Sequence, residues 1–265
     1  MKKTKDSYSN TKIAIVFFIL LAFFVGLSLT FKLVLVVRAG QFDSSKRFNL
    51  TLLDNKNLEV MSIGPTEKTI AVFKLRDVGG NEAGKFLGVP IDGFLLCNCL
   101  DLNQKPDSIF LKAIFNYKKV QTNLTVIDLV KLLIFSRTIA PSAVVTRNIE
   151  NDLIISELDK VVIELTSDEL VEKDNQIIQI INGTDVVGLG NRLARLVTNM
   201  GGDVIIVATS ESPRKESNIL YIDQKTYTIE RLQKVLGYPA KRDAGNAISD
   251  ITIIIGEDKV NLAPF

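Results

Sequence analysis

The sequence predicts an α/β (α+β) protein with an N-terminal transmembrane helix, a reduced mixed-sheet domain, and a second domain in the order βαββαβ. Three observations predict this class. A long uncharged apolar run stands near the N-terminus. Short strand patterns separated by turn residues follow it. Beyond residue 176, strand patterns alternate with two stretches whose apolar residues repeat with helical periodicity.

The apolar run is the first element. Residues 13–31 read IAIVFFILLAFFVGLSLTF, 19 residues without a charge, and the apolar character resumes over 33–37. A run of this length can cross the hydrocarbon core of a bilayer. We therefore predict a transmembrane anchor over 13–37, behind a tail of residues 1–12. The alternative is a cleavable signal peptide, whose apolar region is normally about 7–15 residues long.

Charges around the run predict its orientation. Four lysines and one aspartate precede it, and basic flanks stay on the cytoplasmic side. Lys32 and Arg38 follow the run and weaken this asymmetry. We expect a single-pass cell-membrane protein whose N-terminus is cytoplasmic and whose C-terminal bulk is extracytoplasmic. Residues 48–265 hold 24 basic and 28 acidic residues, a balance that argues against nucleic acid as a partner.

A linker over 38–47 leads to the first predicted domain, residues 48–172. The segments FNLTLLD, LEVMSIG and TIAVFKL alternate with turn signals and predict a β-meander over 48–75. A mostly apolar strand, IDGFLLCNCLDL, follows, and then a short helix near 109–115. Thr125 is predicted to cap a second helix, whose apolar stripe comprises Val126, Leu129, Val130, Leu133 and Ile134.

The end of this domain is less regular. Residues 152–165 predict either a further helix or a pair of strands. The polar stretch TSDELVEKDNQ, residues 166–176, has no apolar stripe. We interpret it as the boundary between the two extracytoplasmic domains.

The second domain, residues 176–265, has the clearer pattern. Strands are predicted over 177–181, 204–208, 218–222 and 250–255, and helices over 188–200 and 228–236. The first helix has an apolar stripe at helical spacing, comprising Leu189, Leu193, Leu196, Val197 and Met200. Arg192 and Arg195 lie off that stripe. The order of elements is compatible with a split βαβ arrangement.

Composition excludes several kinds of site. The chain has no histidine, which excludes histidine-based triads and histidine metal sites. Cys97 and Cys99 would share one face of a strand, and a bridge between them would strain disulfide geometry. We interpret them as small apolar residues in a buried strand, with a two-thiol metal site as the alternative. No catalytic, cofactor-binding or metal-binding residue is predicted from this composition.

The turn in IINGTDVVGLGNRLARL has the glycine spacing of a phosphate-binding loop. Gly183 and Gly188 are correctly spaced, but Leu189 and Gly190 stand where the lysine and the serine or threonine should be. Leu193 stands at the third glycine of a dinucleotide-binding fingerprint. The sequence therefore predicts a structural corner. Asn182 and Gly183 suit a turn with positive φ, and Gly188 and Gly190 permit a tight entry into the helix.

This stretch, followed by GGDV, resembles the C-terminal domain of LytR-type proteins, LytR_C, over about residues 176–259. The turn that marks the family comprises Asn182, Gly183, Thr184, Gly188 and Gly190. Tyr221 and ITIIIGED, residues 251–258, match later parts of the pattern. LTLLDNKNLEVMSIGPTEKT and LGVPIDGFLLCN further resemble the LytR-CpsA-Psr domain. In that family, the domain transfers wall glycopolymers from polyprenyl phosphate to peptidoglycan.

Departures from that family decide the predicted chemistry. Gly64-Pro65-Thr66 stands where the family has Pro-Arg-Asp, and the arginine-rich segment that grips the pyrophosphate has no counterpart. Such a transfer needs arginines and a metal to neutralise charge in the transition state. The resemblance therefore implies a degenerate LytR-CpsA-Psr-like domain in a non-catalytic envelope protein without a cofactor. Its expected partners are the membrane, peptidoglycan or wall glycopolymer, or other envelope proteins.

The alternative is an active phosphotransferase that attaches glycopolymers to peptidoglycan. It would require magnesium, and Arg76, Asp77 and Asp92 would be its candidate residues. The competing interpretation of Arg76 and Asp77 is a solvated strand end. Asp92 is expected mainly to pack the entry of a strand.

Overall fold

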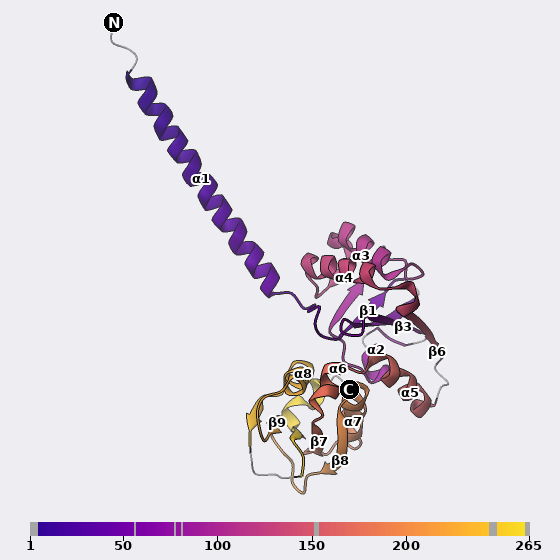
Figure 1. Ribbon diagram of the computed structural model, residues 1–265. Helices are drawn as coiled ribbons and strands as arrows, with labels where there is room; N and C mark the ends of the chain where they lie inside the picture. The colour runs from indigo at the N-terminus through magenta and orange to yellow at the C-terminus, as the bar shows by residue number, and fades with distance from the viewer. Residues whose placement is uncertain are drawn as a thin grey trace. The chain divides into compact units, whose positions relative to one another are not determined.

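The computed structural model describes residues 5–55, 57–76, 78–80, 82–150, 154–243 and 248–262. The chain divides into two compact units, residues 1–40 and 41–265. Within its described residues, the first unit contains one helix, α1 (Lys5–Arg38) (Figure 1). Its segment Lys12–Lys32 is long and apolar enough to cross a membrane, and none of it is buried inside the protein. The N-terminal apolar helix predicted from the sequence is thus present.

The second unit begins with a six-stranded mixed sheet in the order β5-β4-β1-β2-β3-β6. The predicted meander is confirmed, because β1 (Phe48–Leu53), β2 (Leu58–Gly64) and β3 (Thr69–Leu75) pair antiparallel in sequence. The remaining strands are β4 (Gly93–Leu96), which is parallel to β1, β5 (Gln121–Thr122), and β6 (Val144–Ile149), which is parallel to β3.

Strand β6 was not predicted from the sequence. Its residues Thr146, Arg147 and Asn148 are exposed, because β6 lies at the edge of the sheet and packs little of its surface. An edge strand of this kind lacks the apolar alternation by which a buried strand is predicted.

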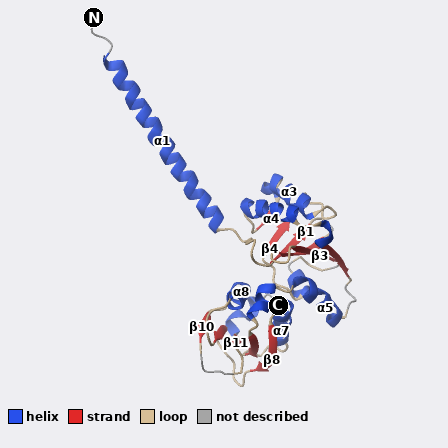
Figure 2. Ribbon diagram, in the orientation of Figure 1, coloured by secondary structure: helices blue, strands red, loops and turns tan. Residues whose placement is uncertain are grey.

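Helices cover both faces of this sheet (Figure 2). On one face lie α3 (Pro106–Phe115) and α4 (Val126–Thr138), which share a core with alternate residues of β1, β2 and β3. On the other face lie α2 (Ala83–Leu87) and α5 (Ile155–Thr166), which pack against the intervening residues of β2 and β3. Residues 155–166 therefore form a helix, which decides between the two alternatives predicted for residues 152–165, of which 152 and 153 lie outside the described residues.

Helix α4 begins as predicted but buries a different stripe. Thr125 caps it, and Asp128 completes a capping box. The buried residues of α4 are Asp128, Leu129, Leu132 and Leu133. The predicted stripe was therefore wrong at Val126, Val130 and Ile134. They are 39%, 39% and 60% exposed. The stripe was misplaced because Asp128 is polar and gave no apolar signal, although it lies on the buried face.

The polar stretch that follows α5 is not an extended linker. It contains a short helix, α6 (Glu169–Asp174), whose N-cap is Asp168 and whose Val171 is buried. Since residues 41–265 form one compact unit, the boundary between domains at residues 172–176, like the linker over 38–47, stays a prediction.

The second sheet has the order β10-β9-β11-β7-β8. Its strands are β7 (Ile177–Asn182), β8 (Asp203–Thr209), β9 (Asn218–Tyr221), β10 (Ala240–Arg242) and β11 (Ile251–Ile255). Helices α7 (Leu189–Asn199) and α8 (Tyr227–Leu236) contribute to its core. The predicted βαββαβ order is present, with the short strand β10 added before the last strand. All five residues of the predicted α7 stripe are buried in this core.

Side chains of α7 also join the second sheet to the helices of the first. Arg195 Nε donates to both carboxylate oxygens of Asp159 on α5, at 2.8 and 3.0 Å. Its other nitrogens donate to the carbonyl oxygens of Lys85 and Phe86, and Asn199 Nδ2 donates to that of Leu87 at 3.0 Å. These donors satisfy carbonyl groups at the C-terminal end of α2, where a helix lacks its own partners.

Candidate functional site

The predicted marker turn closes on its own polar groups. Asn182 Oδ1 accepts hydrogen bonds from Thr184 N at 3.1 Å and Thr184 Oγ1 at 2.8 Å. Asn182 Nδ2 donates to the carbonyl oxygen of Val186 at 2.9 Å. These contacts support the interpretation of the turn as a structural corner.

Gly183 and Gly188 are needed in this turn, but the physical reason at Gly183 differs from the one predicted. Positive φ occurs at Gly188 (77°), and neither Asn182 nor Gly183 is among the described residues with positive φ. A Cβ on Gly183 would instead lie 2.5 Å from Arg214 Cγ and 2.8 Å from the Ile255 carbonyl oxygen. Gly183 is therefore required by close approach of neighbouring chain segments, and Gly188 by its left-handed backbone.

The two cysteines correct the sequence interpretation. Strand β4 ends at Leu96, and Cys97 and Cys99 form a disulfide within the turn that follows. Both are partly buried and pack against the first core. The prediction of two unbonded residues in a buried strand was wrong, because the chain leaves the extended conformation at Cys97. The pair is also not a two-thiol metal site in this structure.

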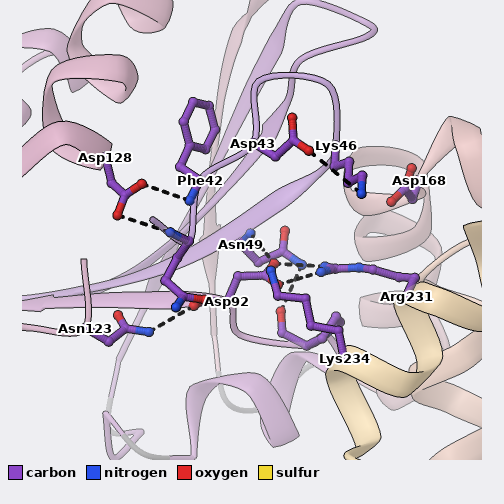
Figure 3. Close-up of polar contacts among 12 residues, drawn as sticks. Phe42, Asp43, Lys46, Asn49, Asp92, Asn123, Asp128, Asp168, Arg231 and Lys234 are labelled. Atoms are coloured by element: carbon purple, nitrogen blue, oxygen red, sulfur yellow. Dashed lines mark hydrogen bonds and ion pairs between the residues drawn. The ribbon is translucent and has the colours of Figure 1, made fainter. Parts of the chain in front are cut away.

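Asp92 directly precedes β4, and its carboxylate contacts Asn49 on β1 and Arg231 on α8 (Figure 3). Its oxygens accept hydrogen bonds from Arg231 on α8, at 2.5 Å from Nη1 and 2.8 Å from Nη2. Asn49 N donates to the same carboxylate at 3.0 Å, and Lys234 Nζ lies 3.7 Å away. The side chains of Arg231 and Asp92 are only 6% and 3% exposed. Such a two-pronged contact is the strong form of an arginine–carboxylate pair.

The protonation of Arg231 and of the nearby Tyr227 is set by their surroundings. Burial alone would lower the pKa of Arg231, but the charge of Asp92 and its hydrogen bonds raise that pKa overall. Tyr227, one turn earlier on α8, donates to Asp168 Oδ2 at 2.7 Å. Burial, and then this contact with Asp168, raises the pKa of Tyr227. Both side chains therefore keep their protons throughout the physiological pH range.

The other two candidates of the alternative function lie elsewhere. Arg76 is exposed and directly follows β3, and Asp77 lies outside the described residues. In the described part of the chain, the ion-pair partners of Asp92 are Arg231 and Lys234. The structure therefore does not bring Arg76 to Asp92.

A cavity of about 510 Å³ lies over β2, β3 and β6, beside the start of α3 and the end of α4. Sequence reasoning missed it. Its apolar lining comprises Met61, Val72, Leu102, Pro106, Ile109, Ile139, Pro141 and Val144. Three cations also line it, Lys74, Lys105 and Arg137. Ligand-binding pockets have volumes of roughly 300–1,000 Å³ and combine an apolar lining with a few polar groups. We refer to it below as the β-face cavity.

Glu59 and Lys74 are the charged pair on the sheet side of this cavity. They are directly opposite each other on β2 and β3, and Lys74 Nζ lies 3.3 Å from Glu59 Oε1. The Glu59 side chain is 3% exposed, whereas that of Lys74 is 36% exposed. Burial raises the pKa of the Glu59 carboxyl, and the charge of Lys74 offsets part of that rise.

This pKa shift predicts a pH-dependent effect of Glu59→Gln. A carboxyl whose pKa is raised on folding stabilises the protein fully below its unfolded pKa and loses that contribution as pH rises through the folded value. The variant has no carboxyl at position 59, so its stability does not fall in this way as pH rises. The free energy of unfolding of the variant minus that of the wild type should therefore increase from about pH 4.5 toward neutrality. Chemical denaturation at several pH values measures the difference. A difference that falls with rising pH would contradict the assignment.

The cavity lining supplies few oxygen ligands of the kind that magnesium prefers. Magnesium prefers oxygen ligands, usually one or two carboxylates with waters and substrate phosphates. The carboxylates that line the cavity within the described residues are Glu59, which is engaged by Lys74, and Asp107. No group of three or more potential metal-ligating side chains occurs among the described residues.

The fold and the apolar helix define a chain with an α/β portion and a segment able to cross a membrane. Residues 177–258 match the LytR_C family, described as the LytR cell envelope-related transcriptional attenuator. This part of the chain is a LytR_C domain, as the resemblance predicted. It comprises β7 through β11, together with α7 and α8. No curated protein sequence matches the chain.

Three solved structures are similar to part of the chain. The transcriptional regulator yvhJ from Bacillus subtilis is 12% identical, with 45% of this chain and 97% of that chain covered and a TM-score of 0.37. Lin1025 from Listeria innocua is 12% identical, with coverages of 44% and 95% and a TM-score of 0.33. The putative transcriptional factor Lmo1026 from Listeria monocytogenes is 11% identical, with coverages of 40% and 81% and a TM-score of 0.28.

Proposed function

We propose that this protein is a membrane-anchored, extracytoplasmic cell-envelope protein that binds a wall polymer without catalysing its transfer. The observation that carries the proposal is the β-face cavity, which combines a broad apolar lining with cations at its edge. The LytR_C domain supports a role at the cell envelope. The apolar helix supports the anchor.

The chemistry of the cavity favours an amphipathic ligand with an anionic group. Apolar surface from the sheet and from Ile109 and Ile139 would take a hydrocarbon chain. Lys105 and Arg137 are exposed at the adjoining helix ends, where they would meet a phosphate. A wall glycopolymer still attached to polyprenyl phosphate has both parts. We therefore prefer it to a partner protein as the ligand.

The absence of catalysis is inferred from how the candidate residues are placed. Asp92 is buried in a two-pronged pair with Arg231. Arg76 does not line the β-face cavity. Phosphoryl-transfer sites depend on cations and metal ions that converge on the transferring group, and these residues do not converge on the cavity.

The proposal is tested with the full-length protein in lipid nanodiscs. Binding of a polyprenyl-pyrophosphate-linked glycan would be measured with and without magnesium. The double variant Lys105→Ala/Arg137→Ala should weaken binding at least several-fold. The matched control, Arg147→Ala/Lys160→Ala, removes two exposed cations that do not line the cavity and should bind as the wild type does. Equal binding by both double variants would reject the cavity as the site.

The same assay distinguishes the proposed non-catalytic function from the alternative phosphotransferase. With peptidoglycan added as acceptor, magnesium-dependent transfer of the glycan phosphate from the lipid pyrophosphate to a peptidoglycan hydroxyl, which releases the polyprenyl phosphate and is lost in Arg76→Ala, would establish a phosphotransferase and overturn the non-catalytic proposal. Retention of the protein on isolated peptidoglycan without any lipid-linked ligand would show that the polymer itself is sufficient for binding.

A further inference from the structure

The outer surface of α4 carries exposed apolar residues in a regular row. Val126, Val130 and Ile134 are four residues apart, so they lie on one face of the helix, and they are 39%, 39% and 60% exposed. Phe115, at the end of the neighbouring helix α3, is 80% exposed. Exposed apolar residues gathered on one surface often mark an interaction site.

Cations accompany this apolar row. Lys131 and Arg137 are exposed on α4, and Lys118 and Lys119 are exposed just after α3. We call Phe115, Val126, Val130 and Ile134, together with these four cations, the outer helical face. On a helix that lies in the interface of a bilayer, basic residues likewise flank the apolar ones.

Charge is distributed unevenly along the second unit. Residues 105–138, which contain α3 and α4, hold six basic and two acidic residues. One of the two acids, Asp128, is buried and accepts backbone hydrogen bonds. The remaining residues of 48–265 hold 18 basic and 26 acidic residues. The helical layer is therefore positive within an otherwise acidic extracytoplasmic portion, a pattern that complements an anionic surface.

The chain also limits how far α4 can be from the apolar helix. Asp128 Oδ2 accepts from Gln41 N and Asp128 Oδ1 from Phe42 N, both at 3.1 Å (Figure 3). These bonds hold the first residues of the second unit on α4. Gln41 follows Lys32, the end of the apolar segment, by nine residues, and nine extended residues span at most about 32 Å. The start of α4 is thus linked to the apolar segment by a short stretch of chain.

We propose that the outer helical face docks on the surface of the membrane that holds the anchor. Its apolar side chains would enter the headgroup region, and its lysines and Arg137 would contact anionic lipid headgroups. The inference rests on the anchor in the proposed function, but it does not depend on what the β-face cavity binds. Docking would keep the cavity near its lipid-linked ligand, since Arg137 belongs to both surfaces.

The chain has no tryptophan, so a single introduced indole reports on one position. The test uses full-length Ile134→Trp in nanodiscs that contain phosphatidylglycerol with brominated acyl chains. The matched control is Val187→Trp, because Val187 is 91% exposed and lies in the turn between β7 and α7, away from α3 and α4 in the chain. We expect a blue-shifted emission for Ile134→Trp, and quenching by the brominated lipid at least threefold stronger than for Val187→Trp.

A charge test accompanies the depth test. Lys118→Glu, Lys119→Glu and Lys131→Glu, added together to Ile134→Trp, should reduce quenching to the level of the control. Reversal of Arg147 and Lys160, two exposed cations outside this face, should leave it unchanged. Equal quenching of Ile134→Trp and Val187→Trp would overturn the proposal. Shielding that depends on protein concentration and not on lipid would also overturn it, and would indicate a second copy as the occupant.

The anchor is checked separately by flotation of the full-length protein with vesicles. A protein that does not float contradicts the anchor itself. A protein that floats but shows no selective quenching contradicts only the docking surface. Selective quenching without binding of lipid-linked glycan would support docking and reject the proposed ligand.

Discussion

Replacement of Asp92 by alanine should lower the free energy of unfolding by about 3–5 kcal/mol, because it leaves the buried Arg231 guanidinium without its counter-charge. Arg231 is 6% exposed in its side chain, so water cannot replace the carboxylate without local opening. The variant also loses the acceptor for Asn49 N. Urea denaturation of the full-length protein in detergent, followed by circular dichroism, measures the change.

Two further variants separate the charge from the packing. Asp92→Leu/Arg231→Met removes both charges and should recover most of the lost stability, since an apolar pair of similar volume often replaces a buried ion pair at little cost. Lys234→Ala is the control, because Lys234 lies 3.7 Å from Asp92 and its side chain is 49% exposed. Its effect should stay within about 1 kcal/mol. A loss as large for Lys234→Ala as for Asp92→Ala would contradict the assignment.

Replacement of Asp128 by alanine should cost about 3 kcal/mol, through the lost helix cap and the unpaired buried donors it leaves. Its carboxylate accepts from Thr125 N at 2.9 Å, and from Gln41 N and Phe42 N at 3.1 Å each. Hydrogen exchange should show faster exchange at Gln41 and Phe42 as well as at the start of α4. This joint response is the signature of one carboxylate that holds two segments.

The control for Asp128 is an acidic residue in the equivalent turn of the neighbouring helix. Asp107 lies in the first turn of α3, and Asp107→Ala should cost at most about 1 kcal/mol, through the lost interaction with the helix dipole. Asp128→Asn should recover part of the loss, since the amide keeps one acceptor oxygen. Normal exchange at Gln41 and Phe42 in Asp128→Ala would refute the role of Asp128 in holding the two segments.

Much of the second sheet could be predicted because its signals are local. The α7 stripe repeats with helical periodicity, and every residue assigned to it is buried. Each of the four predicted strands overlaps an observed one. Strand β10 was missed because it has three residues, two of which are Lys241 and Arg242. A short, charged edge strand has no pattern that distinguishes it from a loop.

The first sheet and the site were predicted less well, for physical reasons. The sequence gives no sign that Asp128 is buried, so the apolar row of α4 was assigned to the core. Cys97 and Cys99 were assigned to a strand because their neighbours are apolar, but the strand ends one residue earlier. The β-face cavity is lined by three strands and two helices. No single stretch of sequence contains enough of that lining to reveal it.

The sequence by itself determined the apolar helix, the meander over 48–75 and the LytR_C pattern over 177–258, because each depends on short-range spacing of residue types. Only the tertiary structure decided the role of Asp92, whose partner Arg231 is 139 residues away. It also decided which apolar residues of α4 remain on the surface. Burial and ion pairing depend on which segments meet, and contacts between distant segments leave no local periodicity in the sequence.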